Sequence, residues 1–264
     1  MKTKSGLKEN KIIILTGASR GIGEATWRML SSKGFQVIAL ARRGDLLEST
    51  AKEIRQTGGE TEWIACDLAD LNATKSLSES LLETYGPPAA VIFNAGASSG
   101  KSFEKNLEAD RIAEINLNYL SPCAMLDVFL PAAKQRGAGK FIAVGSLSAL
   151  TSFPGNATYA ASKSAMASLW RSLDLEYQRF GIDFSLVLPG LTNTDMTDDL
   201  KTFLPRRSPT SVAQLIFKTL LKPGLAQTHG AENQAILAIS RIFPATTHKF
   251  MSRFQNLIVP RKAD

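Results

Sequence analysis

Tyr159 and Lys163 stand four residues apart, a spacing that places two side chains on the same face of a helix. The lysine ammonium would then lie near the tyrosine ring and lower the pKa of the phenol, which is about 10 in water. A tyrosine with a lowered pKa can give a proton to a carbonyl oxygen, or take one from an alcohol, at neutral pH. The pair alone would also fit an ordinary exposed helix face, so the rest of the chain must supply the context.

A glycine-rich segment near the N-terminus supplies part of that context. The apolar run at 11–15 predicts a buried parallel strand, and it leads into Gly17, Gly21 and Gly23 and then into a segment with helical periodicity. Gly17 allows the tight turn, Gly21 lets the backbone approach a pyrophosphate, and Gly23 permits close helix–strand packing. The free N–H groups of the helix would face the phosphates. The segment therefore predicts a dinucleotide site, and it lacks the Gly-Lys-Ser/Thr of a Walker A loop.

With these motifs in register, the chain resembles the short-chain dehydrogenase/reductase family. The matches fall in the family's order and at its spacings, and they cover about residues 10–220. They are Thr-Gly-x-x-x-Gly-x-Gly at 16–23, Asn94-Ala95-Gly96, Asn116, Ser146, Tyr159-x-x-x-Lys163 and Pro189-Gly190.

Strand-like apolar runs alternate with helix-like segments along the chain. This alternation predicts an α/β fold, a doubly wound parallel sheet of the Rossmann type in a single domain, 1–264, with the cofactor at the carboxyl ends of the strands beside the first strand. We expect a basic tail at 1–10, a substrate lid at 191–208 and a C-terminal extension at 232–264. The strand-like runs are 11–15, 35–41, 62–66, 90–93, 140–145 and 183–188.

Composition and charge restrict the classes of function. Two cysteines indicate no disulfide framework, and two distant histidines indicate no metal site. No signal peptide or membrane-spanning run is visible, so we expect a cytoplasmic protein. The net charge of +7 comes from the ends, +3 from residues 1–11 and +4 from residues 241–264. A neutral body argues against a nucleic-acid-binding groove, while the basic ends are either solvated or touch an anionic surface.

The end of the second strand favours NADP(H) over NAD(H). The family's NAD-binding members have an acidic residue there, and this chain has Ala41 instead. Arg42 follows at once and Arg20 lies in the glycine-rich turn, so two guanidinium groups could bind the 2′-phosphate of NADP. By resemblance Asp67, after the third strand, meets the adenine edge, and helix capping is its competing use.

The resemblance and the chemistry of hydride transfer together assign catalytic roles. Ser146 would donate a hydrogen bond to the substrate oxygen, Tyr159 would act as general acid, and Lys163 would lower the pKa of Tyr159 and hold the nicotinamide ribose. Asn116 resembles the residue that holds a proton-relaying water, although a capping or kink amide is the alternative. Ser148 competes with Ser146, but its spacing to Tyr159 is wrong for the family.

The same resemblance implies the residues that contact the cofactor. The usual aliphatic residue two positions after Gly190 is replaced by Thr192, whose backbone N–H could still bind the carboxamide. Thr194 could bind the carboxamide or a phosphate. The full set is Gly17, Ser19, Arg20, Gly21, Ile22, Gly23, Arg42, Asp67, Leu68, Asn94, Ala95, Gly96, Tyr159, Lys163, Pro189, Gly190, Thr192 and Thr194.

Apolar side chains in the predicted lid favour an apolar ketone or aldehyde as substrate, although they could also pack the lid onto the body. Besides Ser146 and Tyr159 we expect Phe153, Leu191 and Met196 at the substrate. The C-terminal extension predicts one or two amphipathic helices. They could cover the cleft, which we favour, or contact a second subunit or a membrane face. We expect a homodimer or homotetramer.

The sequence thus predicts an NADP(H)-dependent oxidoreductase that interconverts a carbonyl and an alcohol. A 3-oxoacyl-thioester reductase has the same catalytic residues, but the Gly-rich seventh strand ending in Asp-Gly that such enzymes often show is missing here. A non-catalytic NADP-binding protein is the alternative from another class, and the intact Asn116, Ser146, Tyr159 and Lys163 argue against it.

Overall fold

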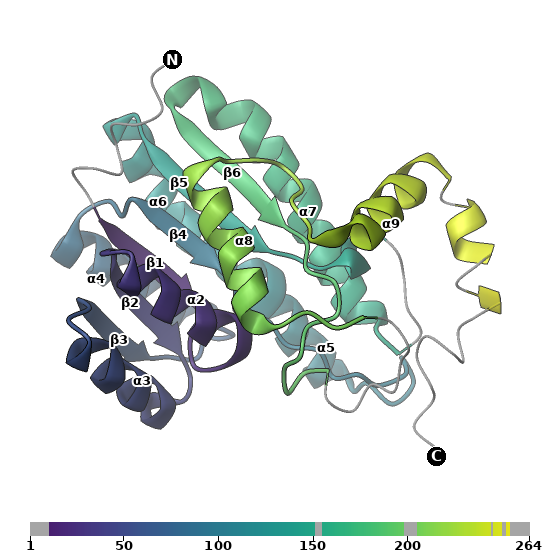
Figure 1. The fold of residues 1–264 in the computed structure, drawn as a ribbon, viewed down its shortest axis with the longest axis horizontal. Helices are drawn as coiled ribbons and strands as arrows, with labels where there is room; N and C mark the ends of the chain where they lie inside the picture. The colour runs from purple at the N-terminus through teal and green to yellow at the C-terminus, as the bar shows by residue number, and fades with distance from the viewer. Residues whose placement is uncertain (1–10, 151–154, 198–204, 244, 250–251, 254–264) are drawn as a thin grey trace.

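The computed structural model describes residues 11–150, 155–197, 205–243, 245–249 and 252–253. Six parallel strands form one sheet in the order β3-β2-β1-β4-β5-β6 (Figure 1). Each strand lies within one residue of the run predicted for it, and the predicted α/β Rossmann fold is confirmed. The strands are β1 (Ile12–Thr16), β2 (Gln36–Ala41), β3 (Thr61–Ala65), β4 (Ala90–Phe93), β5 (Gly139–Val144) and β6 (Ile182–Val187).

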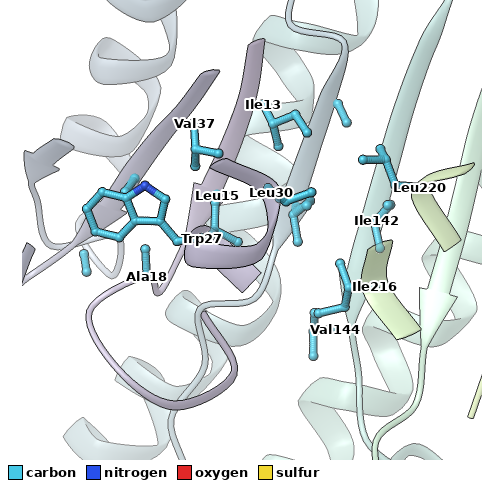
Figure 2. Packing of buried hydrophobic residues seen from close by; sticks show 14 of the residues in the cluster. Ile13, Leu15, Ala18, Trp27, Leu30, Val37, Ile142, Val144, Ile216 and Leu220 are labelled. Carbon is cyan, nitrogen blue, oxygen red and sulfur yellow. The ribbon is translucent and has the colours of Figure 1, made fainter. Parts of the chain in front are cut away.

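Helices cover both faces of the sheet, which is why the strands are apolar without alternation. Side chains of one strand point to opposite faces, so Ile13 and Leu15 join one core cluster and Ile14 the other. Figure 2 shows the first cluster, in which Trp27 and Leu30 contribute from the helix after β1. The first face carries α2 (Gly21–Ser32), α3 (Gly44–Gln56) and α8 (Pro209–Leu221); the second carries α4 (Leu71–Tyr85), α6 (Ser121–Arg136) and α7 (Ala157–Tyr177).

The order of the strands places a crevice at the carboxyl end of β1. The chain leaves β1 toward β2 on one side, while β4 pairs with β1 on the other. At such a reversal the segments that follow the strands diverge and leave room for a ligand. The segments that follow β1, β4 and β5 all begin at this carboxyl edge of the sheet.

A π-helical turn interrupts the long helical stretch between β4 and β5. Here α5 (Glu108–Ile115) runs through the π-turn η1 (Asn116–Leu120) directly into α6. Such a turn changes the rotational phase of the side chains that follow it and is frequent at functional sites.

Beyond α8, the segment 224–228 runs parallel to β6. Gln227 N donates to Leu186 O at 2.8 Å, and Leu188 N donates to Gln227 O at 2.8 Å. In the described residues this pairing is an isolated bridge rather than a full strand, in line with the missing seventh-strand pattern. Helix α9 (Gly230–Ile242) follows, and it confirms the predicted C-terminal helix (Figure 1).

Candidate active site

The tyrosine and the serine singled out from the sequence meet at the carboxyl end of β5. Tyr159 lies in the first turn of α7, and Ser146 stands between β5 and the short 3-10 turn η2 (Leu147–Ala149). The phenol of Tyr159 and the hydroxyl of Ser146 lie near enough for the hydroxyl to act on the pKa of the phenol. Ser146 Oγ also accepts from Ser148 N at 3.1 Å, which orients the hydroxyl. Ser146 thus contacts the phenol through its side chain, and Ser148 supports it through its backbone.

Lys163 lies one helical turn beyond Tyr159 and is buried, with only 4% of its surface exposed. Its Nζ donates to Val144 O at 3.0 Å and lies 5.7 Å from the centre of the Tyr159 ring. Burial lowers the pKa of Lys163 to about 8. A Cβ at Gly96 would lie 3.2 Å from this Nζ, so the glycine leaves the space beside the ammonium clear.

The expected effect of Lys163 on Tyr159 is corrected by the structure. The sequence predicted a lowered pKa for the phenol, but burial raises the pKa of Tyr159. The nearby Ser146 hydroxyl offsets part of this rise, and the charge of Glu114 adds to it. Removing the phenolate from water is the larger effect here. The phenol of the protein alone therefore keeps its proton at neutral pH.

Two side chains that the sequence analysis did not consider hold the segment after β4. Asn118 is fully buried; its Oδ1 accepts from Ala97 N and its Nδ2 donates to Ala97 O, both at 2.9 Å. Nδ2 also donates to Ser162 Oγ at 3.0 Å, which links this segment to α7. Glu114, four residues earlier, accepts from Ser99 N at 2.5 Å. Because α5 and η1 also carry charged and polar residues that are not buried, the sequence offered no signal that Asn118 and Glu114 would be the buried ones.

Asn116 itself faces another part of the molecule. It begins the π-turn η1, and its Nδ2 donates to Ala69 O over a long 3.4 Å. Asn118 Oδ1, in contrast, lies beside Lys163, since a Cβ at Gly96 would be 3.2 Å from both groups. The structure therefore brings the side chain of Asn118 to the lysine, and the role of Asn116 in a water relay stays a prediction.

We expect Asn118→Leu to lower the free energy of unfolding by about 2–4 kcal/mol, because it leaves the partly buried N–H and C=O of Ala97 unpaired. Asn116→Leu is the matched control and should cost less than about 1 kcal/mol, because it loses a single long hydrogen bond. Urea unfolding of both variants measures the difference. Equal losses would show that Asn118 does not hold the segment.

The glycine-rich turn can accept a dinucleotide phosphate. Gly17 has a φ of 67°, and a Cβ there would lie 2.7 Å from Ala95 Cα. A Cβ at Gly23 would lie 2.0 Å from Gly17 O, so any side chain would break the turn. Helix α2 begins at Gly21 without a side-chain cap, which leaves backbone N–H groups for an anion. These features fit the pyrophosphate of NAD(P).

Thr16 and Asn94 fasten this turn to the segment after β4. Thr16 Oγ1 accepts from the backbone N–H groups of Asn94 and Ala95, both at 3.0 Å. The Asn94 amide donates to Thr16 O at 3.1 Å and to Gly17 O at 3.0 Å. The side chain of Asn94 thus holds the glycine-rich turn in place. This agrees with the predicted position of the segment 94–96 behind the adenosine ribose. In the turn, Ser19 is partly exposed, and Ile22 packs on the core.

The residues predicted at the adenosine lie around the end of β2. Arg42 is exposed directly after the strand, and Arg20 forms an ion pair with Asp195 across the crevice. Asp67 Oδ1 accepts from Ala69 N at 3.0 Å in a local turn. Asp67 therefore does not cap α4, whose cap is Asp70. The Leu68 side chain is in the core, so only its backbone can reach a ligand.

The segment after β6 lies against the glycine-rich turn. A Cβ at Gly21 would be 3.0 Å from the Thr194 methyl. Thr192 is buried, and its Oγ1 donates to Gly190 O at 3.1 Å. Leu191 O accepts from Arg207 N at 2.8 Å, which ties the two ends of the predicted lid together.

The remaining predicted contacts are placed as follows. Pro189 is buried, and its carbonyl accepts from Leu147 N at 3.2 Å. Met196 is exposed, as a substrate-facing lid residue would be. Phe153 and residues 198–204 of the predicted lid lie outside the described residues.

Comparisons with known proteins agree with this geometry. The family model for short chain dehydrogenase matches residues 11–204. An uncharacterized oxidoreductase of Listeria innocua is 31% identical over 194 residues, which are 73% of this chain and 78% of that protein. A 3beta-hydroxysteroid dehydrogenase of Mediterraneibacter gnavus is 29% identical over 204 residues, 75% and 73% of the two chains. The structure of an alcohol dehydrogenase from Thermococcus sibiricus, complexed with 5-hydroxy-NADP, matches with a TM-score of 0.73 and 28% identity over 83% of this chain and 95% of that one.

Proposed function

Because the chain belongs to the short-chain dehydrogenase/reductase family of NAD(P)-dependent oxidoreductases, we propose that it reduces an apolar ketone or aldehyde with NADPH. The observation that carries this proposal is the meeting of Ser146 and Tyr159 at the end of β5, with the buried Lys163 one turn away. When bound, the nicotinamide supplies the hydride that reaches the carbonyl carbon.

Residues of the chain stabilise the charge on the substrate oxygen and give it a proton. Negative charge develops on the oxygen during reduction, and the Ser146 hydroxyl donates a hydrogen bond to it. The Tyr159 phenol gives it a proton. Burial keeps that phenol protonated, the state from which it can give a proton. Lys163 and the glycine-rich turn would hold the ribose and the pyrophosphate.

Preference for NADPH is supported by Arg42 at the end of β2. The preceding Ala41 is 6% exposed and carries no charge that would repel a 2′-phosphate. The Thermococcus sibiricus relative was solved with an NADP derivative, which supports the same choice. Arg20 can join Arg42 only if its ion pair with Asp195 opens.

We expect Arg42→Ala to raise KM for NADPH by about 10–100-fold and to change KM for NADH little, because a charge-assisted hydrogen bond is worth about 1.5–3 kcal/mol. Arg43→Ala is the control, since Arg43 precedes α3 and its carbonyl accepts from Leu47 N. Steady-state kinetics with both cofactors measure the effect. An unchanged ratio of the two KM values would remove Arg42 from the phosphate site.

An apolar substrate is supported by the apolar Leu191 and Met196 of the predicted lid and by the relative named as a hydroxysteroid dehydrogenase. The test is the oxidation of NADPH and NADH across a panel of ketones, aldehydes, ketosteroids and 3-oxoacyl thioesters. Turnover of an apolar ketone with NADPH would support the proposal. Preference for a 3-oxoacyl thioester would reassign the substrate. Tight NADPH binding without turnover on any compound would favour a non-catalytic NADP-binding protein.

A further inference from the structure

The last turns of α9 carry an exposed apolar face. Ile239, Ile242 and Phe243 are 49%, 66% and 58% exposed. Their spacing of three and four residues places them on one side of the helix end. Figure 1 shows α9 reaching beyond the body, and within the described part of the chain no other helix or strand makes an extensive contact with it. Three large apolar side chains clustered in this way indicate a binding surface rather than scattered exposure.

The charge around this face is mainly basic. Residues 233–263 contain five Lys and Arg and neither Asp nor Glu. Among the described residues, Lys249 lies in the helical stretch 245–249 that follows α9, and Arg253 lies at 252–253; both are exposed. We call Ile239, Ile242, Phe243, Lys249 and Arg253 the C-terminal surface. Apolar and basic side chains without acidic ones are typical of a segment that lies in the interface of an anionic bilayer.

The first turn of α9, in contrast, is fixed to the body. Asn233 is buried, and a Cβ at Gly190 would lie 2.6 Å from its amide nitrogen. Just before the helix, Thr228 Oγ1 donates to Leu188 O at 2.6 Å. The C-terminal surface is therefore presented from a base attached to the turn after β6. The expectation that the extension covers the cleft fits this first turn only, because the apolar end of α9 is exposed.

The like charge argues against a second copy of the chain as the partner. A symmetric contact between two such surfaces would bring Lys249 and Arg253 of one copy toward the same cations of the other, and the surface contains no acidic residue to pair with them. Within the part of the chain that the structure describes, no helix is long and apolar enough to cross a membrane. A suitable partner has a negatively charged outer layer, which attracts the basic residues, above an apolar interior, which receives the apolar residues.

We propose that the C-terminal surface binds a bilayer rich in acidic phospholipids. Ile239, Ile242 and Phe243 enter the boundary between headgroups and acyl chains, and Lys249 and Arg253 pair with lipid phosphates. Because the first turn of α9 packs against Gly190, binding in this orientation would hold the site near the bilayer, where apolar carbonyl compounds dissolve. The access to apolar substrates rests on the proposed function, whereas lipid binding by itself does not.

Co-sedimentation of the full chain with lipid vesicles tests the proposal without any turnover assay. We expect binding to vesicles of mixed phosphatidylcholine and phosphatidylglycerol, weakening as salt is added, and little binding to phosphatidylcholine alone. Ile242→Ser with Phe243→Ser should weaken binding by about tenfold or more. Lys249→Glu with Arg253→Glu should weaken it by at least about 25-fold, since each basic residue contributes roughly fivefold.

Leu175→Ser is the matched control, because Leu175 is a 69% exposed apolar residue on α7, outside the C-terminal surface. It should leave vesicle binding unchanged. Circular dichroism and NADPH titration establish that each variant is folded. Absence of binding to the anionic vesicles, or equal loss in the control, would overturn the proposal. A dimer in solution that the Ile242 and Phe243 changes dissociate would assign the surface to a second copy instead.

Discussion

Tyr159→Phe is expected to lower kcat for carbonyl reduction by about 10³-fold and to leave the affinity for NADPH unchanged. The change removes one oxygen, which is the proposed proton donor and lies near the Ser146 hydroxyl. General acid catalysis by a positioned side chain contributes about 10²–10⁴-fold, so the loss should be of that size. Steady-state kinetics and fluorescence titration with NADPH measure the two quantities separately.

Tyr177→Phe provides the matched control on the same helix. Tyr177 packs against Phe180 and Phe184 at the other end of α7, so its hydroxyl is distant from the proposed chemistry. That variant should keep kcat within about twofold, as is usual for changes away from the site. If Tyr159→Phe also kept its turnover, the proton would have to come from another group, and the general-acid assignment would be wrong.

The strands and the glycine-rich turn were predictable because their causes are local. A buried parallel strand must be a short apolar run, as at Ile12–Thr16, and the turn that follows admits no Cβ at Gly23. Distances between helical neighbours are local too, so the four-residue spacing placed Lys163 near Tyr159. These features depend on the backbone over a few residues, which a single sequence reveals directly.

The sign of the Tyr159 pKa shift was not predictable in the same way. Spacing gives proximity, but it does not say how much water the fold removes or where the lysine points. In the structure Lys163 donates to Val144 O, and burial determines the direction of both pKa shifts. Desolvation is a property of the assembled site, built from segments far apart in the chain.

The role of Asn118 was missed for a related reason. Its partners, Ala97 and Ser162, lie 21 and 44 residues away in sequence, and the π-turn η1 changes which side of the helix faces them. The resemblance directed attention to Asn116, whose side chain faces Ala69. Only the assembled structure shows that the buried amide beside Lys163 belongs to Asn118.

Lys163→Met is expected to abolish most activity and yet stabilise the folded protein at neutral pH. The activity should fall by at least about 100-fold, because the ammonium proposed to hold the ribose is lost. The wild-type lysine has a pKa of about 8 when folded against an ordinary value of 10.5, a difference of about 3 kcal/mol. Losing the hydrogen bond to Val144 O offsets part of this gain. A net stabilisation of about 1–2 kcal/mol should remain.

The pH dependence tests the cause of this stabilisation. Below pH 8 Lys163 is charged in both states, so the folded wild type bears the full cost of the buried ammonium. Between pH 8 and 10.5 the unfolded chain binds more protons than the folded one, and wild-type stability therefore rises with pH. Urea unfolding should thus show the advantage of Lys163→Met at roughly pH 7 and its loss by roughly pH 10.

Lys140→Met is the control for this pair of effects, since burial also lowers the pKa of Lys140, whose Nζ donates to Leu220 O at 2.7 Å, away from the site. The Lys140→Met variant should keep the activity of the wild type. A Lys163→Met variant that is less stable than wild type at neutral pH would contradict the burial argument. If the predicted pattern is found, the buried ammonium of Lys163 is retained because the chemistry requires it, and stability is lower as a result.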